Sequence, residues 1–243
     1  MLSLLIMQHK TLWIVVVILV FLVGLVATCF SQKKYGRLPK GDRLKRIEQS
    51  PNYSDGQFHN LHPTPVNTAE KQSFLKMMNK FLFDKTPNLR PDSALMVVKT
   101  DLKHLDKNQN LIVWFGHSSY YLQLDGVSYL VDPVFYAASP VSFVIKPFNG
   151  TNIYKPEDMP DIDYLIITHD HWDHLDYKTV RELKNRIGHV ICPLGVGEDF
   201  EYWGFDVNKI IEMDWHEKAS LSKEVQLHCL PARHFSGRLL TPN

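Results

Sequence analysis

The sequence has few cysteines, almost no net charge and no internal repeat. Cys29, Cys192 and Cys229 are too few and too scattered for a disulfide framework. The formal net charge of +1 argues against nucleic acid as the main partner. The 243 residues are 44% hydrophobic and 22% charged, so the chain can build a sizeable core. We therefore expect one globular domain with an appendage.

The appendage is a long apolar run near the N-terminus. Residues 11–30 carry no charge and match the ~20 residues that a helix needs to cross a bilayer. No face of such a helix is polar, which argues against a buried helix of a soluble domain. The run is also longer than the ~7–15 apolar residues of a signal peptide. We predict a single-pass anchor after a short tail (residues 1–10), with lipidation at Cys29 as an alternative.

Basic residues follow the predicted anchor. Lys10 alone precedes it, whereas seven come after it: Lys33, Lys34, Arg37, Lys40, Arg43, Lys45 and Arg46. The positive-inside rule therefore favours the cytoplasmic side for the following domain. The expected membrane is a bacterial inner membrane. Because Gly36, Pro39 and Gly41 break structure, residues 31–50 are predicted to be a juxtamembrane linker. Its charges can rest on anionic headgroups or remain solvated.

The rest of the chain, residues 51–243, is predicted to form one domain. Its extension, residues 51–105, contains an apolar stripe ending at Leu82, which predicts a core-packing helix that begins at Asn67. In the core, residues 106–243, strands alternate with helices, and Asp125-Gly126 marks a hairpin. This pattern predicts the α/β (mixed α+β) class with a mixed sheet.

Histidines and aspartates gather in the loop Thr168–His174, directly after the apolar strand Tyr164–Ile167. His169 and His171 can converge on one metal ion, and His234, which also follows a strand, is the best third ligand. Zinc is the default metal for imidazole and carboxylate ligands. A bound metal lowers the pKa of its water toward ~7, which provides a nucleophile at neutral pH.

The same loop offers groups for a second metal ion. Asp173 and His174 point to an adjacent site, and both are candidate catalytic residues, with Asp173 alternatively acting as a general base. Asp132 is expected either to brace the loop or to cap a turn. His117 either lines the pocket or is structural, and Asp170 is expected to stabilise the loop.

The motif His169-x-His171-x-Asp173-His174 resembles the signature of the metallo-β-lactamase superfamily. The chain looks most like the branch that contains N-acyl-phosphatidylethanolamine-hydrolysing phospholipase D and its bacterial relatives. The similar stretches are 51–60, 114–119, 132–134, 168–176, 193–197, 214–215 and 231–238. The resemblance implies an αββα sandwich and two zinc ions, with His169, His171 and His234 on one and Asp173 and His174 on the other.

The chain departs from this family pattern after His234. The pattern continues with a bridging aspartate and a further histidine, but only nine residues follow His234, and none is Asp or His. The expectation from sequence is therefore a C-terminally truncated domain with an incomplete second half. Weak metal binding and little activity are expected of such a chain.

The resemblance and the anchor together predict a membrane-anchored zinc hydrolase. The expected substrate is a phosphodiester of a membrane lipid of the N-acylphosphatidylethanolamine type. Hydrolysis of a lactone, thioester or nucleotide on the same fold is the alternative among enzymes. An inactive remnant or a membrane-tethered binding module is the alternative from another class. The expected partners are membrane lipid and a small-molecule or phospholipid substrate, without nucleic acid.

Overall fold

The computed structural model describes residues 2–63, 73–84, 87–142, 145–222 and 224–238. The chain divides into two compact units, residues 1–35 and residues 36–243. The boundary predicted at residue 51 therefore falls inside the second unit.

The first unit is dominated by one helix, α1 (Leu2–Phe30), followed by the 3-10 turn η1 (Lys33–Tyr35). The helix begins at Leu2, so it includes residues 2–10, which precede the predicted anchor. Within the described chain, Trp13–Phe30 is the segment long and apolar enough to span a membrane. A signal sequence near the N-terminus passes the same test of length and hydropathy, so the helix alone does not establish an anchor.

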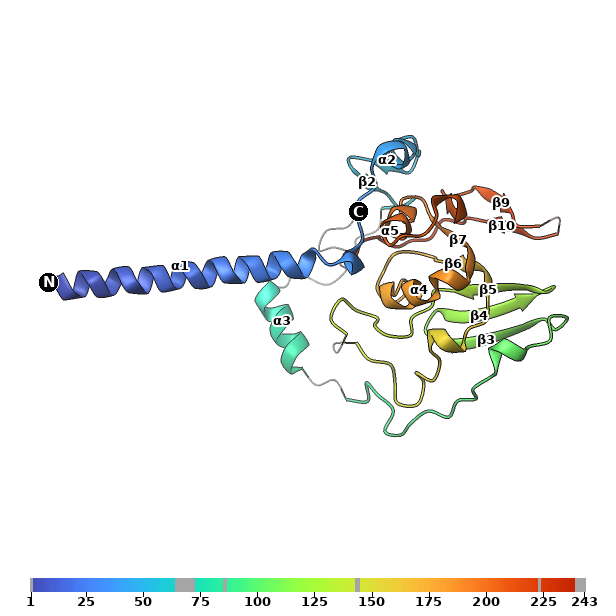
Figure 1. Ribbon diagram of the computed structural model, residues 1–243, viewed down its shortest axis with the longest axis horizontal. Coiled ribbons are helices and arrows are strands. Elements are labelled where there is room, and N and C mark those ends of the chain that lie inside the picture. Colours follow the sequence, from blue (N-terminus) through green and yellow to red (C-terminus); the bar gives the residue numbers. More distant parts are fainter. Residues whose placement is uncertain (1, 64–72, 85–86, 143–144, 223, 239–243) are drawn as a thin grey trace. The chain divides into compact units, whose positions relative to one another are not determined.

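The second unit is built around one six-stranded sheet, with strand order β3-β4-β5-β6-β7-β8 (Figure 1). Its strands are β3 (Leu111–Gly116), β4 (Ser119–Leu124), β5 (Val127–Val131), β6 (Ile162–Ile166), β7 (Ile187–Pro193) and β8 (Ile210–Met213). β3, β4 and β5 are antiparallel neighbours, whereas β5 through β8 pair in parallel. This mixed sheet confirms the predicted fold class.

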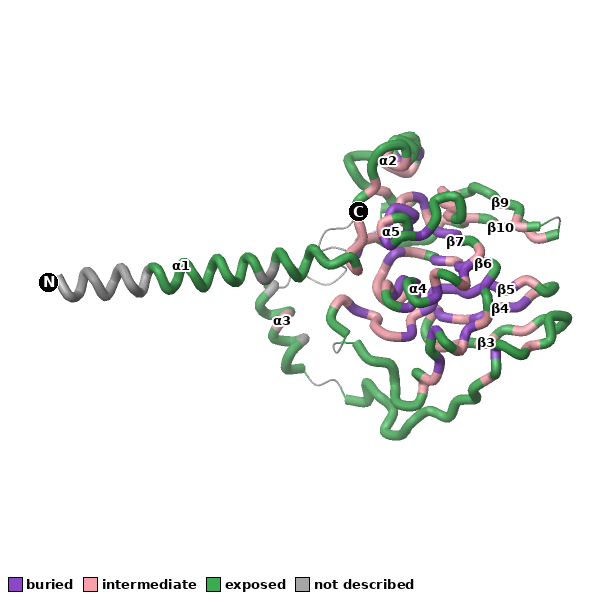
Figure 2. Tube along the Cα trace, viewed as in Figure 1, coloured by how far each residue is buried: buried purple, intermediate pink, exposed green. Residues whose placement is uncertain are grey.

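Helices pack on one face of the sheet. Leu130, Leu165 and Val190 share a register across β5, β6 and β7 and are fully buried. They belong to one core cluster with residues of α4 (Tyr177–Leu183) and α5 (Gly197–Tyr202). Figure 2 shows this core as the buried centre of the unit. Burial of apolar side chains contributes ~25 cal/mol per Å2 removed from water, so this packed face stabilises the unit.

The opposite face carries less cover among the described residues. Ile112 and Trp114 of β3 are exposed there. The separate two-stranded sheet of β9 (Lys218–Ser220) and β10 (Gln226–His228) approaches this face, where the Tyr164 hydroxyl donates to the Leu221 carbonyl oxygen. The described chain thus has one complete helix-and-sheet layer pair and a small second sheet.

The basic linker is more ordered than predicted. It contains helix α2 (Gly41–Glu48), and the backbone N–H of Arg37 donates to Asp199 Oδ1 at 2.8 Å. The Arg43 guanidinium pairs with Glu198 and with Glu212 of β8. Positive charges that the sequence left for solvent or lipid are therefore partly neutralised by acidic side chains of the same unit.

The helix predicted to pack in the core differs from the prediction in its bounds and in its burial. Its predicted start at Asn67 lies outside the described residues, and the helix there is α3 (Phe74–Phe83). Leu75 is 76% exposed and Leu82 is 61% exposed, so this stripe does not pack in the core. The remaining elements are the hairpin β1 (Tyr53–Ser54) and β2 (Gln57–Phe58) and the 3-10 turns η2 (Leu102–His104), η3 (Pro156–Asp158), η4 (Lys184–Arg186) and η5 (Val207–Lys209).

Candidate metal centre

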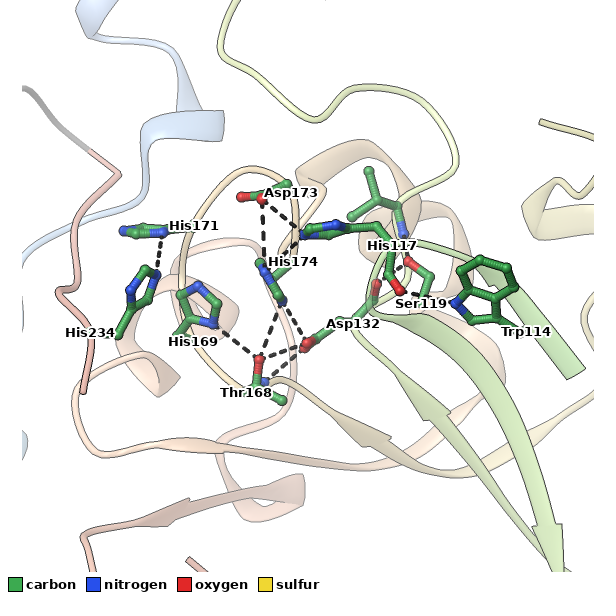
Figure 3. A network of polar contacts seen from close by, with 11 residues as sticks. Trp114, His117, Ser119, Asp132, Thr168, His169, His171, Asp173, His174 and His234 are labelled. Carbon is green, nitrogen blue, oxygen red and sulfur yellow. Dashed lines mark hydrogen bonds and ion pairs between the residues drawn. The ribbon is translucent and has the colours of Figure 1, made fainter. Parts of the chain in front are cut away.

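Three loops converge at one edge of the large sheet (Figure 3). Because β4 is antiparallel to both β3 and β5, and β6 is parallel to β5, the carboxyl ends of β3, β5 and β6 share this edge. His117 follows β3, Asp132 follows β5, and the loop 168–174 follows β6. Polar residues from distant parts of the sequence therefore meet where the ends of open α/β sheets typically hold ligands.

The first cluster consists of His169, His171 and His234. Their ring centroids are 4.7 Å apart in all three pairs. His234 Nε2 lies 3.1 Å from His171 Nδ1. The Nε2 atoms of His169 and His171 are buried and have no hydrogen-bond partner among the described residues. A buried polar atom without a partner is costly, and these imidazole nitrogens fit a metal ion as their missing partner.

Burial keeps the imidazoles of His169 and His171 neutral. It lowers the pKa of His169 to about 3, with further lowering from the neighbouring rings of His174, His171 and His234. Burial also lowers the pKa of His171. Neutral imidazole is the form that binds a metal, because protonation removes the ligand lone pair. At neutral pH His169 and His171 therefore present nitrogen ligands rather than positive charge.

A tether from Asp170 positions the third histidine. Asp170 is buried, and its Oδ1 accepts the Gly237 N–H at 2.9 Å and the Ser236 hydroxyl at 3.1 Å. On the other side, the Asn60 side-chain oxygen accepts the backbone N–H of His234 at 3.1 Å. The bonds to Asp170 hold the segment around His234 against the 168–174 loop, and the bond to Asn60 holds it from the other side. The side chain of His234 is exposed.

The second cluster consists of His117, Asp173 and His174. His117 Nε2 lies 3.0 Å from Asp173 Oδ2 and 3.3 Å from His174 Nε2. Sequence reasoning left His117 between a pocket residue and a structural one, and the structure adds it to the cluster. His117 lies in the hairpin turn that ends β3, and its backbone has a positive φ of 46°. Non-glycine residues in this region mark strained and often functional positions.

Asp132 fixes the orientation of His174. It is fully buried, and its Oδ1 accepts the Thr168 backbone N–H at 2.8 Å. Its Oδ2 accepts the Thr168 hydroxyl at 2.6 Å and lies 2.8 Å from His174 Nδ1. Burial lowers the pKa of His174, but the hydrogen bond to Asp132 and the negative charges of Asp132 and Asp173 together outweigh burial, so the pKa is raised. His174 Nδ1 is thus occupied as a donor, which leaves Nε2 facing Asp173 and His117.

The two clusters lie directly beside each other. The ring centroids of His169 and His174 are 3.9 Å apart. Each cluster offers three ligand atoms within 4.8 Å of one another, as a metal ion requires. The structure therefore brings together the five sequence-predicted ligands in two adjacent groups and places His117 with the second group.

Comparisons with known proteins agree with this geometry. Residues 128–243 match the family described as the beta-lactamase superfamily domain. An uncharacterized protein of Mycobacterium tuberculosis is 35% identical over 201 residues, which are 81% of this chain and 53% of that protein. The N-acyl-phosphatidylethanolamine-hydrolyzing phospholipase D 1 of Caenorhabditis elegans is 33% identical over 141 residues, 53% of this chain and 38% of that protein.

A shorter match involves a metal-dependent hydrolase of Haloquadratum walsbyi. It is 33% identical over 64 residues, which cover 26% of this chain and 22% of that protein. The chain spans about half the length of the mycobacterial relative. The family predicted from the histidine motif is confirmed. Residues 128–243 thus belong to the metallo-β-lactamase superfamily, whose members among the matched relatives include metal-dependent hydrolases.

Proposed function

We propose that this chain is a membrane-anchored, zinc-dependent hydrolase of phosphodiester bonds in membrane phospholipids of the N-acylphosphatidylethanolamine type. The observation that carries the proposal is the pair of buried Nε2 atoms on His169 and His171 without a described partner. They lie beside a third imidazole and a second group of potential ligands. This arrangement suits metal-assisted hydrolysis better than catalysis by a single side chain.

The donor set favours zinc. His169, His171 and His234 would hold one ion, and Asp173 and His174, with His117 beside them, would hold the second. Imidazole nitrogen with a carboxylate oxygen is a common ligand set for zinc, and the descriptions of the matched relatives do not fix the metal. When bound, zinc supplies a Lewis acid and lowers the pKa of water toward ~7.

The protein's own residues orient the site and provide a proton acceptor. Asp132 holds the His174 ring by its Nδ1, so the other nitrogen is directed at the site. The Asp173 carboxylate is 43% exposed and lies next to His117. As the alternative to binding the second ion, it can accept a proton from an incoming group. His117 and Asp173 line the open side of the site, which is where a substrate must arrive.

Membrane phospholipid is the substrate class that two independent features support. The relative from Caenorhabditis elegans is named for hydrolysis of N-acyl-phosphatidylethanolamine. The apolar helix Trp13–Phe30 would keep the site close to such lipids if it spans the membrane. An attached enzyme meets its lipid substrate at a high effective concentration.

Metal content and hydrolysis test the proposal on the full chain in detergent or nanodiscs. Elemental analysis should find zinc, and His169→Gln or His234→Gln should reduce it. His189→Gln is the matched control, because His189 is an exposed histidine of β7 outside both clusters. A chain purified with iron or manganese, or with no metal after zinc is supplied, would overturn the zinc assignment.

Substrate choice is tested separately. The chain should cleave N-acylphosphatidylethanolamine, and a chelator should abolish the cleavage. Chelator-sensitive cleavage of a lactone, thioester or nucleotide with none of the phospholipid would overturn the phosphodiester assignment and leave the metal site intact.

The anchor and its sidedness have their own test. The chain should stay with the membrane after alkaline carbonate extraction, and the domain after residue 35 should be protected from protease added outside spheroplasts. Release by carbonate would contradict an anchor, and cleavage in intact spheroplasts would contradict a cytoplasmic domain.

A further inference from the structure

Helix α3 presents apolar side chains to solvent. Leu75 and Leu82 are 76% and 61% exposed, and Met77 and Phe83 are exposed as well. Figure 2 shows α3 as largely exposed, and its Met78 is half-buried. A helix of a soluble unit normally turns such a stripe toward the core, and α3 does not.

Most apolar residues of α3 lie away from its two lysines, whereas Phe83, seven residues after Lys76, lies on the lysine side. Leu75, Met78 and Leu82 recur at i, i+3 and i+7, which places them on one face. Lys76 and Lys80, at i and i+4, occupy another face. The sequence Phe74–Phe83 contains no Asp or Glu, so the two lysines are the only charged residues of this amphipathic helix.

We propose that α3 lies in the surface of an anionic lipid bilayer. Its Leu75, Met78 and Leu82 would enter the boundary between headgroups and acyl chains, and Lys76 and Lys80 would pair with lipid phosphates. Helices with this composition lie in the plane of the interface with the apolar face ~5–10 Å deep. Each basic residue near such a surface adds attraction to anionic lipid.

Charge decides between a bilayer and other occupants of this face. A protein groove or a second copy of the chain can cover apolar side chains, but two flanking lysines without a carboxylate match a surface of phosphates. A second copy of α3 would bring like charges together. The attachment is additional to α1, because it concerns the unit of residues 36–243 and does not require that α1 spans the membrane.

Single fluorophores on α3 test the proposal. An environment-sensitive label is placed by Leu75→Cys, Leu82→Cys or Lys76→Cys in the full chain with Cys29 and Cys229 replaced by serine, since Cys192 is buried. The protein is reconstituted in vesicles that contain phosphatidylglycerol and lipids brominated near the carbonyl end. At an interfacial depth of ~5–10 Å, the labels at 75 and 82 should be quenched at least about twofold more than the label at 76.

Charge reversal provides a second readout. Lys76→Glu together with Lys80→Glu should reduce the quenching of the label at 82. The control pair is Lys103→Glu with Lys107→Glu, two exposed lysines with the same spacing and the same change of charge. The control pair should leave the quenching unchanged.

Three outcomes would overturn the proposal. They are equal quenching of the three labels, equal quenching in purely zwitterionic vesicles, and a spectral shift without lipid that grows with protein concentration, which would indicate a second copy. Flotation of the labelled chain with vesicles after a high-salt wash reports on α1 separately. Zinc content and hydrolysis are measured on the same samples, so failure of the proposed function is distinguishable from failure of the α3 contact.

Discussion

His174 Nδ1 lies 2.8 Å from Oδ2 of Asp132, a carboxylate that is completely buried at the end of β5. The pair joins two sheet strands at the candidate metal centre, and the backbone of Asp132 has a positive φ of 42°. Because Asp132 also accepts two hydrogen bonds from Thr168, it orients both the start and the end of the histidine loop.

Asp132→Asn should weaken metal binding at the second cluster. The amide offers one acceptor oxygen in place of two, so His174 has to direct a lone pair at the new NH2 group and carry its proton on Nε2. Loss of such an orienting partner typically lowers metal affinity ~10–100-fold. Titration against a competing chelator measures the change. Asp163→Asn is the control, since that carboxylate bonds Ser128 away from the site; unchanged affinity in Asp132→Asn would contradict the orienting role.

Asp170→Ala should weaken binding at the first cluster. The change removes the acceptor for the Gly237 N–H and the Ser236 hydroxyl, which together hold the segment that carries His234. Ser236→Ala removes one of these two bonds and should have a smaller effect in the same direction. Zinc titration of the three proteins measures this order, and a loss in Ser236→Ala as large as in Asp170→Ala would refute the tether.

Arg43→Met should destabilise the unit by about 3 kcal/mol, because it leaves a buried carboxylate with fewer partners. The Glu198 side chain is 2% exposed and pairs with Arg43 and Arg37, while Glu212 pairs with Arg43 as well. Urea unfolding in detergent measures the free energy of unfolding. Lys45→Met is the control: its ion pair with Asp42 is largely exposed, so the change should cost less than ~1 kcal/mol. An equal loss of unfolding free energy in the two variants would show that the ion pairs of Arg43 stabilise the unit no more than an exposed pair.

Asp199→Asn should stabilise the protein increasingly as the pH rises. Burial raises the pKa of Asp199 from 3.8 to about 7, although Arg238 and the Arg37 N–H favour the charged form. Between these values the unfolded chain has lost the proton and the folded chain keeps it, so the contribution of Asp199 to stability falls as the pH rises toward 7. Asparagine removes this loss and keeps an acceptor for Arg37.

Urea unfolding of both proteins at about pH 5 and about pH 8 measures the effect, and each pKa unit corresponds to ~1.4 kcal/mol. The advantage of the variant should be larger at the higher pH. An advantage that is the same at both pH values would contradict the raised pKa. Asp206→Asn, at an exposed carboxylate that caps η5, is the control for the general effect of removing a charge.

The sequence determined the mixed α/β class, the apolar helix and the candidate ligands on the loop after β6. These features are local, because a strand, an apolar run and a cluster of histidines are visible in consecutive residues. His234 was also within reach, since it follows a strand and the ends of strands tend to converge. The family followed from resemblance, which the match of residues 128–243 bears out.

Only the tertiary structure decided which groups meet at the site. His117 joins Asp173 and His174 because β3 and β6 end at the same edge of the sheet, although 56 residues separate His117 from Asp173. Likewise, Arg43 pairs with Glu198, a residue far away in the sequence, and Leu75 is exposed because no distant segment packs over it among the described residues. Composition and periodicity carry no information on such pairs, since strand order and loop path set which side chains come within bonding distance.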